Sequence, residues 1–145
     1  MTDPQILLDY EAHGLAIAER PGILDDLREA LECDEISAAI VEPLADDEPT
    51  RAHLAALRAR AKRIRAAYAA VVAELGRRAV AHHLAERDRL LEIATRPGNS
   101  QAVTDSLRPL IVAREDDAKW IAADTAEELA DIPQRRILAI DRPTN

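Results

Sequence analysis

The stretch from Arg51 to Thr95 contains no proline, and its apolar residues recur every three or four positions. This spacing places them along one side of an α-helix, where a second helix would cover them. At 1.5 Å per residue, one uninterrupted helix over this stretch would be roughly 65–70 Å long. The first half of this apolar seam consists of Leu54, Leu57, Ala61, Ile64, Tyr68, Val71 and Leu75. The sequence therefore predicts a long helix over residues 51–95 at the centre of an all-α fold.

Gly76 marks a change in this pattern. After it, the apolar positions follow Val80, Leu84, Leu91 and Ala94, which are out of register with the seam before it. A shift of register means that a straight helix would present its two halves in different directions. We therefore expect a kink or a change of packing partner near Gly76, and the pattern leaves open whether the helix is continuous there.

Proline and glycine divide the region before the long helix into two helices and a loop. Asp3 is a typical N-cap before a proline, and the helix that it opens should reach about Arg20. Pro21 and Gly22 then interrupt the chain, and a second helix follows. The pattern leaves open whether this helix is unbroken through Cys33 and Asp34 to Glu42. An acidic loop leads from there to the long helix.

Helix starts also recur in the last third of the chain. Ser100 is a plausible N-cap, Pro109 favours the first turn of a helix, and Thr125 begins a Ser/Thr-x-x-Glu capping box. We therefore expect several short helices in this region rather than one long helix. A tail should follow Pro133, because proline rarely continues a helix.

The composition agrees with helices packed on one another. Leu, Ile, Val and Ala supply most of the apolar residues and the chain has no Phe, which suits close helix packing better than strands. We expect an all-α protein, either an elongated helical bundle or a helical hairpin, with a single domain over residues 1–133. Its parts would be acidic helices within residues 1–42, a long basic helix over 51–95, short C-terminal helices within 100–132, and an extended C-terminal tail over 134–145.

Positive charge is concentrated in the first part of the long helix. Residues 51–73 include six positive residues and no negative one, whereas residues 1–50 carry 14 acids and two bases. Arg58, Lys62 and Arg65 share one side of the helix beside the seam, and we expect an acidic surface against this side. The acids at the start of the second helix should point outward, which would leave these three cations free for a partner. These acids are Asp25, Asp26, Glu29 and Glu32.

No arrangement of residues in the sequence points to catalysis. Cys33 is the only cysteine and lies between two acids, which favour the unreactive neutral thiol. The four glycines are isolated, so the sequence has no glycine-rich loop of the phosphate-binding kind. His82, His83 and Glu86 supply one pair of metal ligands at i,i+4, but a closed site needs about four ligands. We therefore expect no enzymatic activity, no metal and no cofactor.

The sequence has neither a signal-peptide pattern nor a run of 18 apolar residues that could span a membrane. A single cysteine cannot form an internal disulfide, which suits a reducing compartment. We therefore expect a cytoplasmic protein that does not bind membranes.

Part of the second half of the chain resembles a known family. Residues 84–93 read Leu-Ala-Glu-Arg-Asp-Arg-Leu-Leu-Glu-Ile, and a turn leads to Leu-Arg-Pro-Leu-Ile-Val-Ala-Arg-Glu-Asp-Asp-Ala-Lys-Trp-Ile at residues 107–121. Over roughly residues 68–130 the chain resembles the small helical chaperones of bacterial flagellar (type III) export. The resemblance implies a non-enzymatic protein that masks an aggregation-prone or assembly-prone helix of its client. Residues 1–50 have no counterpart in this resemblance.

Together these features predict a non-enzymatic helical adaptor or chaperone whose partner has an acidic or amphipathic helical surface. A homodimer through the apolar seam would also bury it. The apolar residues would supply burial, and the cations would set partner choice. The predicted partner-binding residues are Leu54, Leu57, Arg58, Lys62, Ile64, Arg65, Tyr68 and Val71. The alternative is a nucleic-acid-associated protein that uses the basic helix over residues 51–65, masked by the acidic N-terminal region.

Overall fold

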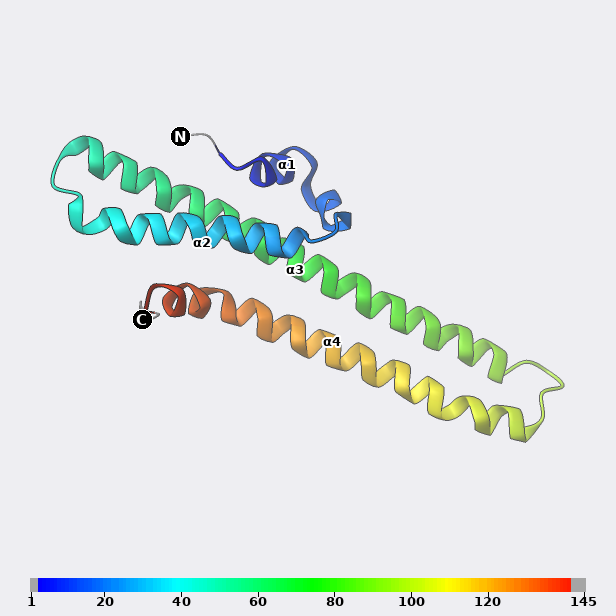
Figure 1. Cartoon of the computed structure of the whole chain (residues 1–145). Coiled ribbons are helices and arrows are strands. Elements are labelled where there is room, and N and C mark those ends of the chain that lie inside the picture. The colour runs from blue at the N-terminus through cyan, green and yellow to red at the C-terminus, as the bar shows by residue number, and fades with distance from the viewer. Residues whose placement is uncertain (1–2, 142–145) are drawn as a thin grey trace. The chain divides into compact units, whose positions relative to one another are not determined.

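The computed structural model describes the backbone of residues 3–141 and the side chains of residues 3–132, and over this part of the chain it contains helices and no strand (Figure 1). The all-α prediction is therefore confirmed, including a long central helix. Two of the six helical elements are short 3₁₀ helices, labelled η. The elements are α1 (Gln5–His13), η1 (Gly14–Glu19), α2 (Ile23–Val41), η2 (Glu42–Leu44), α3 (Glu48–Ala94) and α4 (Gln101–Asp141).

The long helix α3 begins three residues earlier than the sequence predicts. The carboxylate of Asp47 accepts a hydrogen bond from the backbone N–H of Thr50 at 2.8 Å, so Asp47 supplies the N-terminal cap. Hydrogen bonds from the side chain and then from the backbone of Thr50 lower the pKa of Asp47 below its ordinary value. At the other end, the Thr95 hydroxyl donates to the carbonyl of Leu91 at 2.9 Å, and Gly98 follows with a φ of 91° that favours glycine. Helix α3 continues without interruption through Gly76.

The region before α3 differs from the prediction at two points. Asp3 does not cap the first helix, because Pro4 occupies the N-cap position of α1 without a side-chain hydrogen bond, and Asp3 instead pairs with Arg63. The first helix ends at His13 instead of near Arg20, because Gly14 takes a φ of 60° and ψ of −138°, which lies outside the helical region. The chain then continues as η1 to Glu19. Helix α2 is unbroken from Ile23 to Val41 and runs back along the first part of α3 (Figure 1).

The C-terminal region also differs from the prediction. One helix, α4, replaces the short helices expected over residues 100–132, and it includes both Pro109 and Pro133. Ser100 does cap its start, since its hydroxyl accepts a hydrogen bond from the N–H of Val103 at 3.3 Å. Thr125 opens no new helix, because its hydroxyl donates to the carbonyl of Ile121, one turn earlier, at 2.7 Å.

The tail expected to be extended over residues 134–145 is helical as far as Asp141, and residues 142–145 lie outside the described residues. A proline removes one backbone hydrogen bond from a helix, and a helix stabilised along its length by packing tolerates that loss. Local breaking signals therefore overestimated the number of helices here.

Packing divides the chain into two compact units, and the division falls within α3 and α4. Unit 1 contains the residues up to Val72 and those from Glu128 onward. Unit 2 contains Ala73–Glu127. The organisation of residues 1–133 as a single domain stays a prediction, and the two units are described separately below.

The core of unit 1 forms where α1, α2 and the first part of α3 meet. Each of these helices contributes fully buried aliphatic side chains, and burying one Leu or Ile contributes about 1.5–3 kcal/mol. The buried aliphatic residues of this unit include Leu7, Ile17, Ile23, Leu27, Leu31, Leu54, Leu57, Ile64, Val71 and Val72.

Unit 2 is a helical hairpin of the second part of α3 and the first part of α4. A Cβ added to Gly76 would lie 2.3 Å from the Thr125 hydroxyl oxygen and 2.9 Å from the Thr125 Cβ. Gly76 therefore permits close approach of the two helices instead of interrupting α3. Before Gly76, ion pairs join α3 to residues 3–42, as in Arg63 with Asp3, and Tyr68 contacts Glu128 of α4; after it, Arg87 lies near Glu115 of α4. A change of packing partner near Gly76 stays a prediction.

Candidate functional site

The apolar residues predicted to bind a partner lie in the core of unit 1. Leu54, Leu57, Ile64, Tyr68 and Val71 are all buried by the chain's own helices. Leu54 and Leu57 form one cluster with Ala38 of α2. A partner would reach these five side chains only after part of unit 1 had opened. The apolar seam of residues 54–71 therefore has a partner helix, as its spacing predicts, and that partner belongs to the same chain.

Tyr68 is the largest of these buried side chains, and its polar end is also satisfied within unit 1. The Tyr68 hydroxyl donates a hydrogen bond to Glu128 at 2.9 Å. Tyr68 also raises the pKa of Arg28, chiefly through a side-chain hydrogen bond. Three helices thus meet at this tyrosine, because Arg28 belongs to α2 and Glu128 to α4.

The acidic surface expected against the basic helix is the chain's own N-terminal region. Five of the six positive residues between positions 51 and 65 form ion pairs with carboxylates of residues 3–48 in the described structure. The pairs are Arg51–Glu48, Arg58–Glu42, Arg60–Asp34, Arg63 with both Asp3 and Glu11, and Arg65–Glu35.

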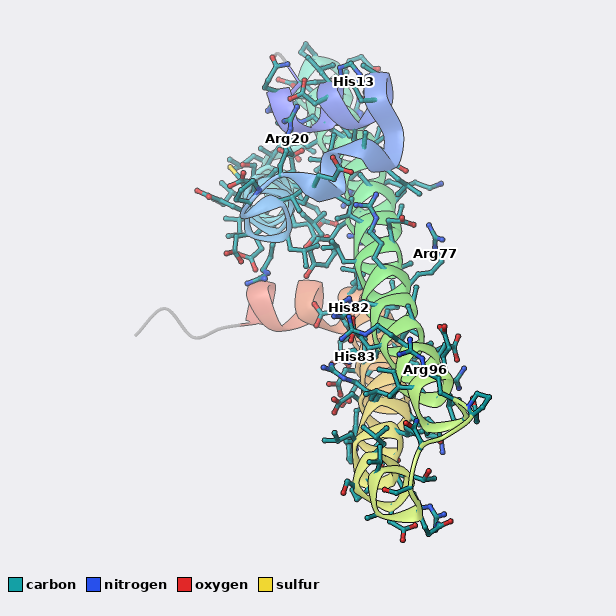
Figure 2. The ribbon with its side chains drawn as sticks, turned by 90° about the vertical axis from the view of Figure 1, so that its right-hand side faces the viewer. His13, Arg20, Arg77, His82, His83 and Arg96 are labelled. Atoms are coloured by element: carbon teal, nitrogen blue, oxygen red, sulfur yellow. The ribbon has the colours of Figure 1, made fainter. Side chains whose placement is uncertain are left out.

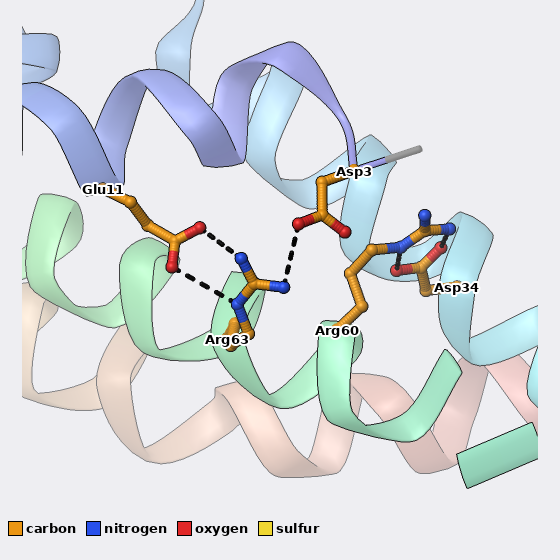
Figure 3. A network of polar contacts seen from close by, with 5 residues as sticks. All are labelled: Asp3, Glu11, Asp34, Arg60 and Arg63. Atoms are coloured by element: carbon orange, nitrogen blue, oxygen red, sulfur yellow. Dashed lines mark hydrogen bonds and ion pairs between the residues drawn. The ribbon is translucent and has the colours of Figure 1, made fainter. Parts of the chain in front are cut away.

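The pair of Arg60 and Asp34 is the most deeply buried of these. Two hydrogen bonds of 2.6 Å join the guanidinium to both carboxylate oxygens, and the side chains are only 11% and 4% exposed. The hydrogen bond with Asp34 raises the pKa of Arg60. Beside it, Arg63 contacts Asp3 at 3.0 Å and also Glu11, so that α1 is tied to α3 (Figure 3).

Two of the three cations predicted to be free are engaged within the chain, and that prediction was wrong for them. Arg58 lies 2.9 Å from Glu42, and Arg65 forms an ion pair with the buried carboxylate of Glu35. For these cations, sequence reasoning considered the acids at the start of α2 and missed Glu35 in its second half and Glu42 in η2. Lys62 differs, because it is exposed and no ion pair of its ammonium occurs within residues 3–132.

Asp34 could have been found from the sequence by its spacing. It follows Leu31 by three positions and precedes Ala38 by four, which places it on the buried face of α2. A charged residue at such a position needs a partner of opposite charge. Arginines on the facing helix were the available partners.

A groove lies between α2 and α3 in unit 1, on the side of α3 that carries Lys62. Its volume is about 490 Å³. Small side chains line part of it, and charged side chains of both signs line the rest. The lining residues are Glu35, Ala38, Ala39, Glu42, Arg58, Ala61, Lys62 and Arg65. The three predicted cationic residues are therefore brought together on one groove, apart from the five apolar residues.

The histidine pair lies on the part of α3 that belongs to unit 2 (Figure 2). Arg114 of α4 lies 3.0 Å from the Nδ1 atom of His83, and a carboxylate oxygen of Asp117 lies 3.8 Å from the same atom. The rings of His82 and His83 meet edge to face at 5.4 Å. Among residues 3–132, no group of three or more His, Cys, Asp or Glu side chains is placed to hold a metal ion.

Comparison with protein-family models, with curated proteins and with solved structures gives no significant match. Within the described residues, no helix combines the length and the apolar character that crossing a bilayer requires. The functional argument therefore depends on the surfaces of this chain itself.

Proposed function

We propose that this protein is a non-enzymatic helical adaptor that binds a partner protein in the groove between α2 and α3. The observation that carries the proposal is the groove itself, with a floor of small residues and charged residues along its sides. Alanines such as Ala38, Ala39 and Ala61 allow the backbone of a partner helix to approach closely. We expect this groove to accept side chains of a partner helix or extended segment.

The charges around the groove favour an acidic segment. Three cations and two carboxylates line it, and both carboxylates already form ion pairs with Arg58 and Arg65. Lys62 therefore supplies the uncompensated positive charge. In addition, the buried Nε of Arg65 has no hydrogen-bond acceptor in the described structure. A carboxylate of the partner would pair with Lys62, and such pairs set partner choice and orientation more than affinity.

Lys62 offers a sharp test of this proposal because it is exposed and has no ion pair among the described side chains, so its substitution should not disturb the fold. Tagged full-length protein would be used in pull-downs from the native host at about 0.1 M salt, where charge pairs still act. We expect one protein to be retained by the wild type and lost with Lys62→Glu. Lys119→Glu makes the same charge change on exposed α4 and should retain it. Equal retention by Lys62→Glu would refute the proposal.

A second variant tests the groove without changing charge. Ala39→Trp would fill the groove from the half-buried face of α2 and should abolish retention of the partner. Ala85→Trp adds the same ring at an exposed position of α3 in unit 2 and serves as the matched control. Thermal melts of both variants would establish that they fold.

The nucleic-acid alternative predicts a different result in the same experiment. The ion pairs of residues 3–48 with the basic helix are the masking arrangement that this alternative requires, but they also leave few cations for phosphates. A nuclease-treated half of each pull-down separates the two proposals. Retained nucleic acid, and proteins lost after digestion, would favour the alternative; binding would then weaken steeply with salt.

Our expectations about the kind of partner, the compartment and the oligomeric state are part of the same proposal. The resemblance to flagellar export chaperones would make the partner a client helix that is masked in the groove, in a bacterial cytoplasm. A homodimer through residues 51–75 would require two copies to exchange α1 and α2, because these helices cover the seam in the monomer. Light scattering at several concentrations would detect such an exchanged dimer.

A further inference from the structure

Helix α2 carries a second stripe, acidic in its first half and apolar in its second, on the side that faces solvent. Asp26, Glu29, Cys33, Ile36 and Ile40 alternate at intervals of three and four, so that at 100° per residue they lie within about 80° of one another. Ile36 is 45% exposed and Ile40 62% exposed, and Leu44 continues the stripe into η2 at 66%. The buried face of α2, with Leu27, Leu31 and Ala38, lies on the opposite side. This stripe is therefore separate from the core of unit 1.

The stripe has a charge polarity along its length. Its first half is acidic, and its second half is apolar. Asp26, Glu29 and Glu32 are exposed and form no ion pair within residues 3–132, although most cations of the neighbouring α3 are paired. Negative charge on this face is thus left unpaired by the side chains that the structure describes.

We propose that this solvent face of α2 binds a basic amphipathic helix of a partner protein. Apolar residues of that helix would cover Ile36, Ile40 and Leu44, and its Lys or Arg residues would lie against the acidic half. The stripe from Asp26 to Ile40 covers 14 steps of 1.5 Å, about 21 Å, which is two heptads of a partner helix. A helix bound to another helix in this way contacts residues spaced three and four positions apart.

A second copy of this chain fits the face poorly. In a parallel pair of α2 helices, the acidic half of one copy would meet the acidic half of the other. In an antiparallel pair centred near Cys33, carboxylates would be buried against Ile36 and Ile40 of the other copy. Both arrangements place charge where it is unfavourable, so charge complementarity favours a basic partner.

The stripe on the solvent face of α2 is separate from the groove of the proposed function, and Cys33 allows it to be tested separately. Cys33 is the only cysteine, it is exposed, and it lies in the middle of the stripe. A helix bound to the stripe would slow the reaction of this thiol with an aromatic disulfide reagent such as DTNB. A ligand in the groove between α2 and α3 would leave that reaction rate unchanged.

The probe would be a synthetic helical peptide of about 18 residues, with lysines in one half and a leucine face in the other, added to the full-length protein. We expect the thiol reaction to slow at least fivefold at saturation, with a Kd of roughly 1–100 µM that weakens with salt. A peptide with glutamate in place of lysine should give no protection. The variant Lys62→Glu should bind the lysine peptide like the wild type, so failure of one proposal would not imply failure of the other.

Two variants of the stripe should reduce binding of the lysine peptide at least tenfold: Ile40→Asp and Glu29→Lys. Their matched controls are Val112→Asp and Glu127→Lys, which make the same changes at exposed positions of α4. The proposal is overturned if the peptide gives no protection up to about 1 mM, or if either stripe variant binds like its control. Self-association of the wild type that Ile40→Asp abolishes would assign the face to a second copy and also overturn it.

Discussion

Removing the carboxylate of Asp34 should destabilise this protein more than any other single charge change in unit 1. The side chains of Asp34 and Arg60 are 4% and 11% exposed and share two hydrogen bonds of 2.6 Å. Substitution of Asp34 by Asn keeps the shape but leaves the buried guanidinium without its counter-charge. Breaking a buried pair in this way costs about 3–5 kcal/mol. Since small domains are stable by about 5–15 kcal/mol, this is a large fraction of the total.

Urea unfolding followed by circular dichroism would measure the free energy of unfolding for three variants. Asp34→Asn should lower it by about 3 kcal/mol or more. Asp25→Asn is the matched control on the same helix, since Asp25 is 79% exposed in its pair with Arg28, and a surface pair contributes at most about 1 kcal/mol. The double variant Asp34→Leu with Arg60→Met should recover most of the loss, because it removes both buried charges.

Two results would contradict this reasoning. A loss below about 1 kcal/mol for Asp34→Asn would mean that the pair is solvated, as surface pairs are. A double variant less stable than Asp34→Asn alone would mean that the side chains matter for their shape and not for their charge. Either outcome would remove the electrostatic account of how α2 is held to α3.

Three further predictions concern other parts of the chain. Gly76→Ala should lower stability by about 1–2 kcal/mol, although alanine has the better helix propensity. Adding Thr125→Ala should restore part of the loss, because it removes Oγ1 and Cγ2, the two atoms nearest to the new Cβ. A Gly76→Ala variant more stable than the wild type would contradict the close contact. Ile64→Ala should lower the free energy of unfolding by about 2–5 kcal/mol, and Ile40→Ala by less than about 0.5 kcal/mol, as measured in urea. Hydrogen bonds from Arg77 and then Arg78 lower the pKa of Glu74 below its ordinary value of 4.5. Ionised Glu74 should therefore stabilise the fold above pH 4.5, and this stabilisation should be lost as the pH falls through the folded-state pKa. Carboxyl carbon NMR titration would test the last point, and a midpoint at or above 4.5 would refute it.

The exposed end of this last contact is visible in Figure 2, where Arg77 extends away from α3. Its side chain is 73% exposed, whereas Glu74 is buried along the helix. The carboxylate is therefore stabilised by neighbours on its own helix. For this reason its titration reports on the helicity of α3 near the start of unit 2.

Much of the fold followed from apolar spacing, and the errors have a common cause. The seam from Leu54 to Val71 and the absence of proline predicted α3 and its burial correctly. Local signals at Pro109 and Thr125, however, predicted helix starts where α4 simply continues. Such signals describe an isolated segment, whereas packing along a neighbouring helix outweighs one lost backbone hydrogen bond.

The candidate site was harder to predict, because sequence patterns treat charged residues as surface residues. Asp34 and Glu35 are both buried, and each pairs with an arginine of α3 far along the chain. Which acid meets which arginine depends on how α2 is rotated and aligned against α3. That alignment is a property of the packed pair, so the spacing could place Asp34 on the buried face of α2 but could not identify the arginine that it pairs with.

The separations of the contacts in unit 1 also have a consequence for the order in which the chain folds. Asp34 and Arg60 are 26 positions apart, Glu11 and Arg63 are 52 apart, and Tyr68 and Glu128 are 60 apart. Closing a longer loop costs more entropy, so the pair of α2 and α3 should form first. During synthesis, α1 would then dock onto an existing hairpin, and the contact of Tyr68 with Glu128 would close last. The acids of residues 3–48 would thus be synthesised before the arginines that they pair with, and the contact with Glu128 would complete unit 1.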